Sequence, residues 1–247
     1  MDAVFTHKSI IVLLLMLLLS AKMQAQLKLS AYFDAGDNNV SEGLYIKSSA
    51  LGSYQINKFR VEGGAQFDLK DAGSNFLTGG SIIVAREFSI NKFLFETQGL
   101  FMYDPFSPLV HESNWGVLAN IPRKHFNYKL GTEFKTYHIT NKAENDYDIT
   151  SNKKLNEKWN LIYLIKYSLK PSEHKWNAGA SITNIDHFLI NQETNPMVNI
   201  EGRYDISSPL TLYVESWYKS AGSLNISANY FSFFFRTGII WKPDLKK

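Results

Sequence analysis

The chain has 247 residues, a nearly balanced charge with 26 Lys and Arg against 23 Asp and Glu, and no cysteine. The charge balance gives no reason to expect a nucleic-acid partner. The absence of cysteine excludes disulfide bonds and a lipid anchor on an N-terminal cysteine.

Residues 1–25 have the pattern of a secretory signal peptide. His7 and Lys8 precede the apolar run Ile10–Leu19, and Ala25 offers a cleavage site before Gln26. Ten apolar residues are too few to cross a bilayer as a helix. The sequence therefore predicts a signal peptide at 1–25 and one mature domain at 26–247, in which no later apolar run is long enough for a transmembrane helix.

The mature chain consists of long runs in which every second residue is apolar, a period typical of β-strands with two different faces. In residues 59–69, for example, Phe59, Val61 and Phe67 alternate with Arg60 and Glu62. About twelve runs are present, at 27–34, 43–56, 59–69, 76–90, 93–104, 109–121, 125–140, 157–170, 176–190, 196–206, 210–220 and 227–242.

The connections between these runs alternate in length. The short ones are Asn57-Lys58, Asn91-Lys92, Pro122–Lys124, Pro171–Lys175 and Ser207–Pro209, and each follows an even-numbered run. The others are longer and more polar, and we expect the longest, 141–156, to be a solvated loop. Residues 54–67 resemble residues 88–101, because each is a strand, an Asn-Lys turn and a strand, which indicates duplicated hairpins.

Two all-β architectures are compatible with alternation. A soluble β-sandwich usually has strands of about 5–6 residues, whereas transmembrane barrel strands need about 9–11, with an even count and turns that alternate in length. Aromatic residues also gather near both strand ends, among them Phe59, Phe93 and Trp176 by the short turns and Phe67, Tyr103 and Tyr137 by the long loops. Two aromatic girdles are typical of the membrane interfaces. We therefore predict a closed antiparallel up-and-down transmembrane β-barrel.

The chain resembles outer-membrane β-barrels of Gram-negative bacteria. Its ending FFFRTGIIWKP at 233–243 is similar to the aromatic last strand read by the barrel assembly machinery, although six residues follow Trp241. Gln26 directly after the cleavage site, together with Asn-Lys turns, is similar to secreted proteins of Bacteroidetes. The resemblance implies an outer-membrane location, with membrane lipids, lipopolysaccharide and the assembly machinery as partners, and no cofactor.

Alternation also assigns the faces of the strands. The face opposite the apolar one carries the predicted lumen-lining set: Lys47, Arg60, Glu62, Glu96, Glu133, Lys166, Glu201, Arg203, Glu215 and Arg236. Acids and bases in a narrow barrel either pair and fill the lumen or line a pore, where charged rings set selectivity.

Arg86 breaks this alternation. Turn geometry at Asn91-Lys92 places it on the lipid face with Val84 and Phe88. Two explanations remain open: Arg86 snorkels to the interface, or a bulge around Ala85–Glu87 turns it inward.

The sequence His111-Glu112-Ser113-Asn114 is the one motif with catalytic character. By parity His111 and Ser113 share the lipid face, near the long-loop rim. The motif resembles the His-x-Ser-Asn of outer-membrane phospholipase A and of the barrel lipid A deacylases, which implies His111 as base and Ser113 as nucleophile. Trp115 replaces the small residue of those families, and no adjacent lipid-facing acid or amide orients His111; the neighbouring run offers Thr136 and His138.

No metal site is predicted. Glu144, Asp146 and Asp148 lie in the loop 141–156, which lacks the glycine and terminal glutamate of a calcium-binding loop. His125, His138, His174 and His187 have no metal-ligand spacing and are expected in loops or at interfaces.

The favoured function is a porin-like channel for small solutes. The alternatives are an acyl hydrolase acting through His111 and Ser113, and a structural or adhesive barrel without a channel.

Overall fold

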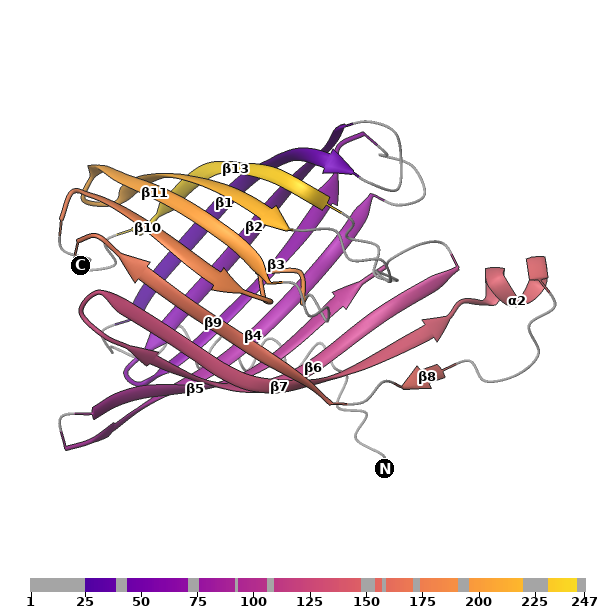
Figure 1. Ribbon diagram of the computed structural model, residues 1–247, viewed down its shortest axis with the longest axis horizontal. Helices are drawn as coiled ribbons and strands as arrows, with labels where there is room; N and C mark the ends of the chain where they lie inside the picture. The colour runs from indigo at the N-terminus through magenta and orange to yellow at the C-terminus, as the bar shows by residue number, and fades with distance from the viewer. Residues whose placement is uncertain are drawn as a thin grey trace, which may run out of the picture.

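The chain forms a closed antiparallel β-barrel of twelve long strands, with one additional short strand at its rim (Figure 1). This computed structural model describes residues 25–38, 44–70, 76–91, 93–105, 109–147, 154–156, 159–170, 174–190, 196–219 and 231–243. The elements are β1 Ala25–Asn38, β2 Leu44–Ile56, β3 Phe59–Asp68, β4 Leu77–Ile90, β5 Phe93–Asp104, β6 Val110–Pro122, β7 Phe126–Ile139, α2 Asn141–Tyr147, β8 Lys154–Asn156, β9 Asn160–Ser168, β10 Trp176–Thr183, β11 Met197–Ser207, β12 Leu210–Lys219 and β13 Phe231–Trp241. The predicted fold class is confirmed, while the predicted signal peptide lies, except for Ala25, outside the described residues.

Each long strand pairs with its neighbours in the chain, and the first strand closes the barrel by pairing with the last. In the β1–β13 ladder Asp34 lies opposite Arg236, and in the β12–β13 ladder Glu215 also lies opposite Arg236. Closure gives every long strand two hydrogen-bonding partners, which removes the free edges that a bilayer does not tolerate.

The short turns lie at one end of the barrel, at the left of Figure 1, and α2 and β8 lie at the other. Asn57 and Asn91 open two of these turns with positive φ angles of 51° and 55°. Tight two-residue hairpin turns have a positive φ at their first central position, a left-handed conformation that asparagine tolerates. Asn57 and Asn91 therefore share this conformation at the equivalent position of β2–β3 and β4–β5, in agreement with the predicted pair of hairpins.

The two faces of the wall differ sharply in polarity. Apolar side chains on the outside are largely exposed, for example Val117 at 59%, Leu130 at 61% and Ile200 at 62%, while polar side chains such as Asp34 and Lys135 are buried inside. An exposed apolar belt around a closed barrel matches the lipid-facing surface of a transmembrane barrel. Tyr137 differs from the expected girdle, because it shares the inward parity of Lys135, whose ammonium lies 5.9 Å from its ring centre.

None of the described helices is long and apolar enough to cross a membrane.

The predicted strand at 176–190 is wrong in its second half. β10 ends at Thr183, and residues Asn184–Ile190, here called the inner segment, turn into the barrel. The Asn184 side chain replaces the ladder on β9, since its Nδ2 donates to the Leu161 carbonyl at 2.7 Å and its Oδ1 accepts from the Tyr163 amide at 2.8 Å. An isolated bridge between Ile185 and Ile190 closes the inner segment on itself.

The described parts of the loop predicted at 141–156 contain regular structure that was not expected. It contains the short helix α2 and strand β8, which pairs with β7 through Thr136 and Asn156. Ala143 of α2 is buried, and the Thr140 hydroxyl accepts a hydrogen bond from its amide at 3.3 Å. That hydroxyl satisfies a free amide at the helix start, which favours helix over solvated coil.

We expect Gly131→Ala to destabilise the barrel, because a Cβ at Gly131 would lie 2.2 Å from the Val117 carbonyl oxygen and the backbone would have to move. Overpacking of this kind costs about 1–3 kcal/mol. The matched control is Gly99→Ala on β5, where the nearest atom is 4.0 Å away. Urea unfolding of the refolded proteins measures the difference, and equal midpoints would contradict the packing argument.

Candidate functional site in the barrel lumen

All ten predicted lumen residues lie on the inward face of the wall. This set comprises Lys47, Arg60, Glu62, Glu96, Glu133, Lys166, Glu201, Arg203, Glu215 and Arg236. They do not form one ring, because they are distributed over eight strands and over the whole height of the barrel.

Arg236 is the centre of the largest charge network. Its Nε and Nη2 contact both oxygens of Asp34 at 2.8 and 3.0 Å, and its Nη1 lies 3.4 Å from Glu215. These three residues are direct register partners on β1, β13 and β12, so strand pairing alone brings them together. Arg236 is only 2% exposed, and its guanidinium also lies near the rings of Tyr32 and Phe234.

A third carboxylate reaches Arg236 from the inner segment. Asp186 accepts two hydrogen bonds from Arg236, from Nη1 at 2.8 Å and from Nη2 at 2.7 Å. Two parallel bonds between guanidinium and carboxylate form a strong and directional pair. Burial alone would raise the pKa of Asp186, but the charge and hydrogen bonds of Arg236 lower it to about 2.

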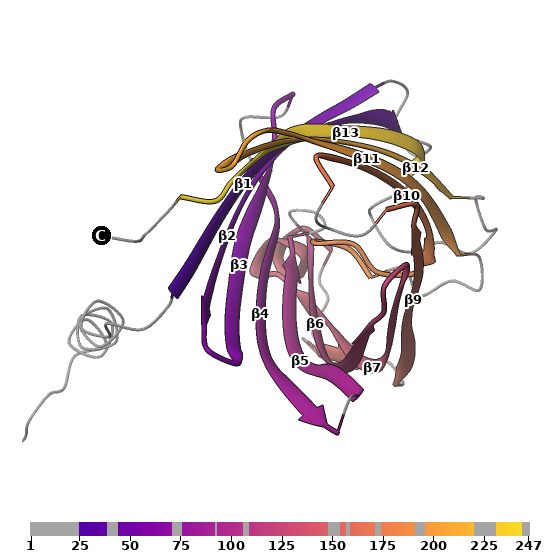
Figure 2. The ribbon, with the colours of Figure 1, turned by 90° about the vertical axis from the view of Figure 1, so that its left-hand side faces the viewer.

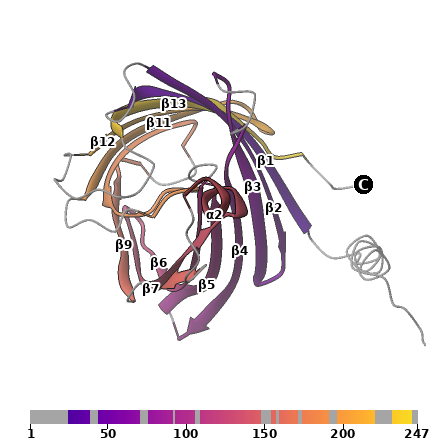
Figure 3. The ribbon, with the colours of Figure 1, turned by 90° about the vertical axis from the view of Figure 1, so that its right-hand side faces the viewer.

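The inner segment fills the middle of the lumen. Ile185 and Ile190 pack with Leu100, Leu118 and Ile162 of β5, β6 and β9. On the other side, Phe188 packs with Tyr32 and Leu51, and Leu189 packs with Met197, Trp217 and Phe234. Figures 2 and 3, which look into the barrel from its two ends, show this segment in orange inside the ring of strands. The segment therefore joins opposite walls.

A cavity of ≈ 230 Å³ lies between the inner segment and the short-turn end. Its charged lining is mixed: Arg60 pairs with Glu62 at 2.9 Å and with Glu96 at 3.0 Å, and Lys166 pairs with Glu201 at 2.6 Å. Lys129 also lines the cavity, and no carboxylate among the described residues pairs with it. The cavity therefore carries charges of both signs beside apolar side chains such as Leu100 and Met102.

The lumen remains charged beyond the inner segment, toward the long-loop end. There the Lys135 ammonium lies 2.7 Å from Glu112, and both side chains are almost fully buried. Lys47 donates to Gln66 at 3.5 Å, and Gln66 in turn donates to Asp34 at 3.2 Å. Polar walls thus continue on both sides of the inner segment.

His187 has an unexpected place on the inner segment. Its ring stacks on Tyr32 at 6.0 Å between ring centres, and its Nδ1 lies 3.8 Å from Glu62. The sequence placed it in a loop or at an interface, because nothing in its local pattern shows that the chain turns inward.

Arg86 lies on the outer face, so the bulge explanation is wrong. The β3–β4 and β4–β5 ladders run without a register shift through Arg86, which lies opposite Phe59 and Thr97. Its guanidinium carbon is 5.0 Å from the ring centres of both Phe59 and Phe88.

His111 and Ser113 lie on the outer face of β6, as parity predicts. The His111 Nδ1 is 2.8 Å from the Tyr103 hydroxyl, and Ser113 is the register partner of Tyr103 and of Thr136. The residue that orients His111 is therefore a tyrosine, which sequence reasoning assigned to the aromatic girdle. In the part of the chain that the structure describes, no hydrogen bond joins His111 to Ser113 and no group of three His, Cys, Asp or Glu residues is placed to hold a metal ion; Asp148 lies outside that part.

No family model matches the sequence, and no curated protein matches it. Solved structures match over the whole barrel: the KdgM porin in complex with disordered oligogalacturonate has a TM-score of 0.54 at 11% identity, covering 88% of this chain and 99% of that chain. The NanC porin has a TM-score of 0.50 at 11% identity, covering 88% of this chain and 100% of that chain. The chain has the fold of an outer-membrane β-barrel. At these identities the similarity concerns the fold alone.

We expect Ser113→Ala to leave the protein folded and functionally unchanged, because Trp115 stands where the resembling families have a small residue and a tyrosine, Tyr103, contacts His111 in place of an acid or amide. Fatty-acid release from phospholipid and from lipid A, measured on purified wild type and variant, checks this. Release by the wild type that is lost in Ser113→Ala would instead show that His111 and Ser113 are a catalytic pair.

Proposed function

We propose that the protein is a porin-like channel for small polar solutes in the outer membrane, narrowed at mid-height by the inner segment. The observation that supports this best is the charged, closed interior, which continues on both sides of the inner segment. The porin structures share the fold, which supports the proposal without naming a solute. Because the lining carries both signs of charge, we infer small polar solutes rather than one class of ion.

The apolar side chains of the inner segment block the direct path at the level of Leu100, Leu118 and Ile162. We infer that permeation depends on how firmly this segment is held. Among its described residues, only Asn184, at its start, bonds to the wall backbone in place of a ladder, through Leu161 and Tyr163 of β9. The residues after Asn184 belong to no ladder strand, so their displacement leaves the barrel wall paired. Arg236 would still keep Asp34 and Glu215 as partners, which avoids the large penalty of an unpaired buried charge.

Conductance should rise in Asp186→Asn, because the neutral amide loses the charged bidentate bond to Arg236 while the wall pair Arg236–Asp34 remains. Single-channel recording in planar bilayers measures the change. Glu201→Gln is the matched control, since it removes one carboxylate from the cavity without touching the inner segment. If both variants conducted like the wild type, the segment would not control the path.

An engineered disulfide that ties the inner segment to β4 in the Asp186→Asn variant gives the opposite test, because it should hold the segment in place. A Cβ on Gly79 would lie 3.3 Å from the Phe188 Cβ, close to the separation of about 3.5–4.5 Å in disulfides, and the chain has no other cysteine. Gly79→Cys with Phe188→Cys and Asp186→Asn should conduct poorly when oxidised and well after reduction. Equal conductance of the oxidised and the reduced protein would contradict gating by this segment.

The ion pair between Asp186 and Arg236 should also remain intact at neutral and mildly acidic pH. The pKa of Asp186 is lowered from 3.8 to about 2, so its contribution to docking is complete above about 3.8 and is lost only as the pH falls toward 2. Acidification to about pH 5 therefore leaves this contact intact.

The preference of the channel for cations or anions should depend on Arg60. In Arg60→Glu three carboxylates meet, at positions 60, 62 and 96, where one guanidinium now serves two, so the channel should shift toward cations. Reversal potentials in a potassium chloride gradient measure the shift, and Arg123→Glu on an exposed turn is the charge-matched control. An equal response of the two variants would place Arg60 outside the conducting path.

A further inference from the structure

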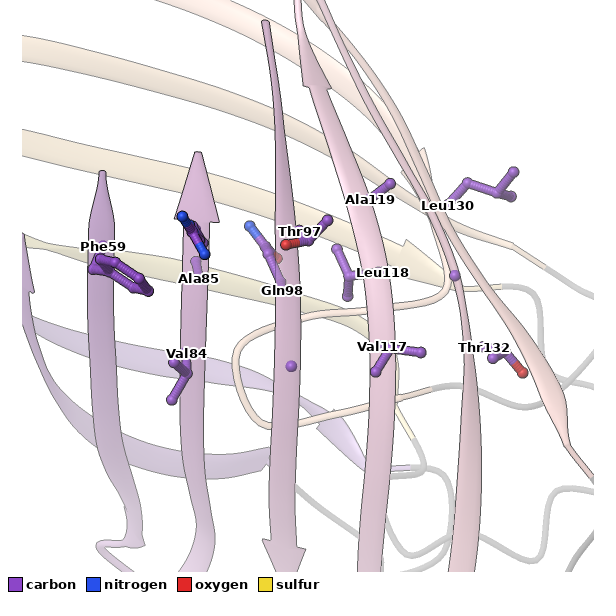
Figure 4. A pocket seen from close by; sticks show the side chains of 13 residues that line it. Phe59, Val84, Ala85, Thr97, Gln98, Val117, Leu118, Ala119, Leu130 and Thr132 are labelled. Atoms are coloured by element: carbon purple, nitrogen blue, oxygen red, sulfur yellow. The ribbon is translucent and has the colours of Figure 1, made fainter. Parts of the chain in front are cut away.

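The outer wall carries a hollow of ≈ 550 Å³ that the channel does not use. It extends across the lipid-facing sides of β3 to β7 and is here called the outer groove (Figure 4). Its rim is formed by exposed apolar side chains, among them Phe59, Val84 and Leu130. Its floor is low because Gly99 and Ala119 present almost no side chain between these rims. In a bilayer such a groove is filled by a lipid chain, because a void on an apolar surface loses its dispersion contacts.

Arg86 lines the same groove at one end. It lies four positions before the last residue of β4, Ile90, and therefore near the short-turn end of the wall. In the described part of the chain no carboxylate pairs with it; its guanidinium instead lies 5.0 Å from the ring centres of Phe59 and Phe88. Contacts with ring faces hold the guanidinium in place and leave N–H groups at its edge available.

An unpaired cation on a lipid-facing wall is unfavourable at membrane depth. It is stabilised when its side chain extends to the headgroup level and pairs with an anion there. Guanidinium binds phosphate through two parallel hydrogen bonds, which a point charge such as lysine does not reproduce. The short-turn end of an outer-membrane barrel faces the periplasm, where the leaflet is made of phospholipid. The charge, its height and the apolar groove beside it therefore fit the phosphate and one acyl chain of the same molecule.

We propose that the outer groove binds an anionic phospholipid of the periplasmic leaflet, with its phosphate on Arg86 and one acyl chain along Gly99 toward Val117. This site is independent of channel activity, so either proposal can fail without the other.

Native mass spectrometry of the refolded protein tests the site, using micelles doped with equal amounts of phosphatidylglycerol and phosphatidylcholine with identical acyl chains. The wild type should retain one phosphatidylglycerol in preference to phosphatidylcholine. Arg86→Gln should lose this preference, because the phosphate loses its cation. Gly99→Leu should lose both lipids, because the new side chain fills the groove; a Cβ there meets nothing closer than 4.0 Å, so the barrel should still fold.

Two matched controls separate the groove from general lipid adhesion. Arg123→Gln removes another arginine that lies over a ring, 4.4 Å from the centre of Phe93, but outside the groove. Gly80→Leu fills another position on the outer wall where a Cβ is 3.9 Å from its nearest neighbour. Both controls should retain the lipid like the wild type, and heat-modifiable migration on gels verifies that every variant is folded.

Three results would overturn the proposal. The first is equal retention of phosphatidylglycerol in Arg86→Gln and wild type, and the second is equal loss in Arg86→Gln and Arg123→Gln, which would show non-specific attraction. The third is a lipid-free dimer of the wild type that becomes monomeric in Gly99→Leu, which would make the outer groove a contact between two copies of the chain.

Discussion

Hydrogen bonding of the backbone in a medium without water is the constraint on which this structure depends. Each unsatisfied amide or carbonyl in hydrocarbon costs several kcal/mol, so the long strands must pair on both edges and the first must meet the last. The β1–β13 ladder meets that requirement, and alternation then follows from it. With one face toward lipid and one toward a closed interior, every second side chain is apolar and the others are confined together. The charges inside are therefore a consequence of closure as much as of function.

Confinement determines how those charges arrange themselves. The ladder places Asp34 and Glu215 on either side of Arg236, which leaves the cluster one negative charge in excess even before Asp186 arrives. Asp186 nevertheless joins, because two geometrically favourable bonds to a guanidinium and the apolar packing of Ile185, Phe188 and Ile190 act together. After Asn184, the inner segment is held by the Asp186–Arg236 pair, by the longer His187–Glu62 contact and by apolar packing, and it lacks the row of backbone hydrogen bonds that fixes a ladder strand. It is therefore better suited to release than a ladder strand. That difference connects the charge network to the proposed control of permeation.

Most of the barrel was predictable from the sequence, because a period of two is local and survives any error in loop length. The faces of Arg60, Glu96 and Lys166 follow from it directly. The inner segment was missed because Trp176, Ala178, Ala180 and Ile182 suggest a strand that simply continues. The available signal was a parity break, since Asn184 and Asp186 occupy positions that should be apolar while Ile185 is apolar where a polar residue is due. Where the displaced residues go is a long-range question, and the partner Arg236 is 50 positions away.

Positions that depart from the alternation are candidates for a role beyond forming the barrel wall, because natural sequences break local rules mainly at functional or strained positions. Arg86 is a charge on the apolar face, the inner segment is an apolar cluster in the polar interior, and His111 is a polar ring on the lipid side. Their surroundings distinguish them. His111 has a hydrogen-bond partner in Tyr103, which satisfies one of its two ring nitrogens within the protein. Asp186 is satisfied only while the inner segment stays docked, and Arg86 has ring faces but no described anion. Arg86 is therefore the residue whose charge most needs a partner from outside the described chain, and it lies on the face of the barrel that meets lipid.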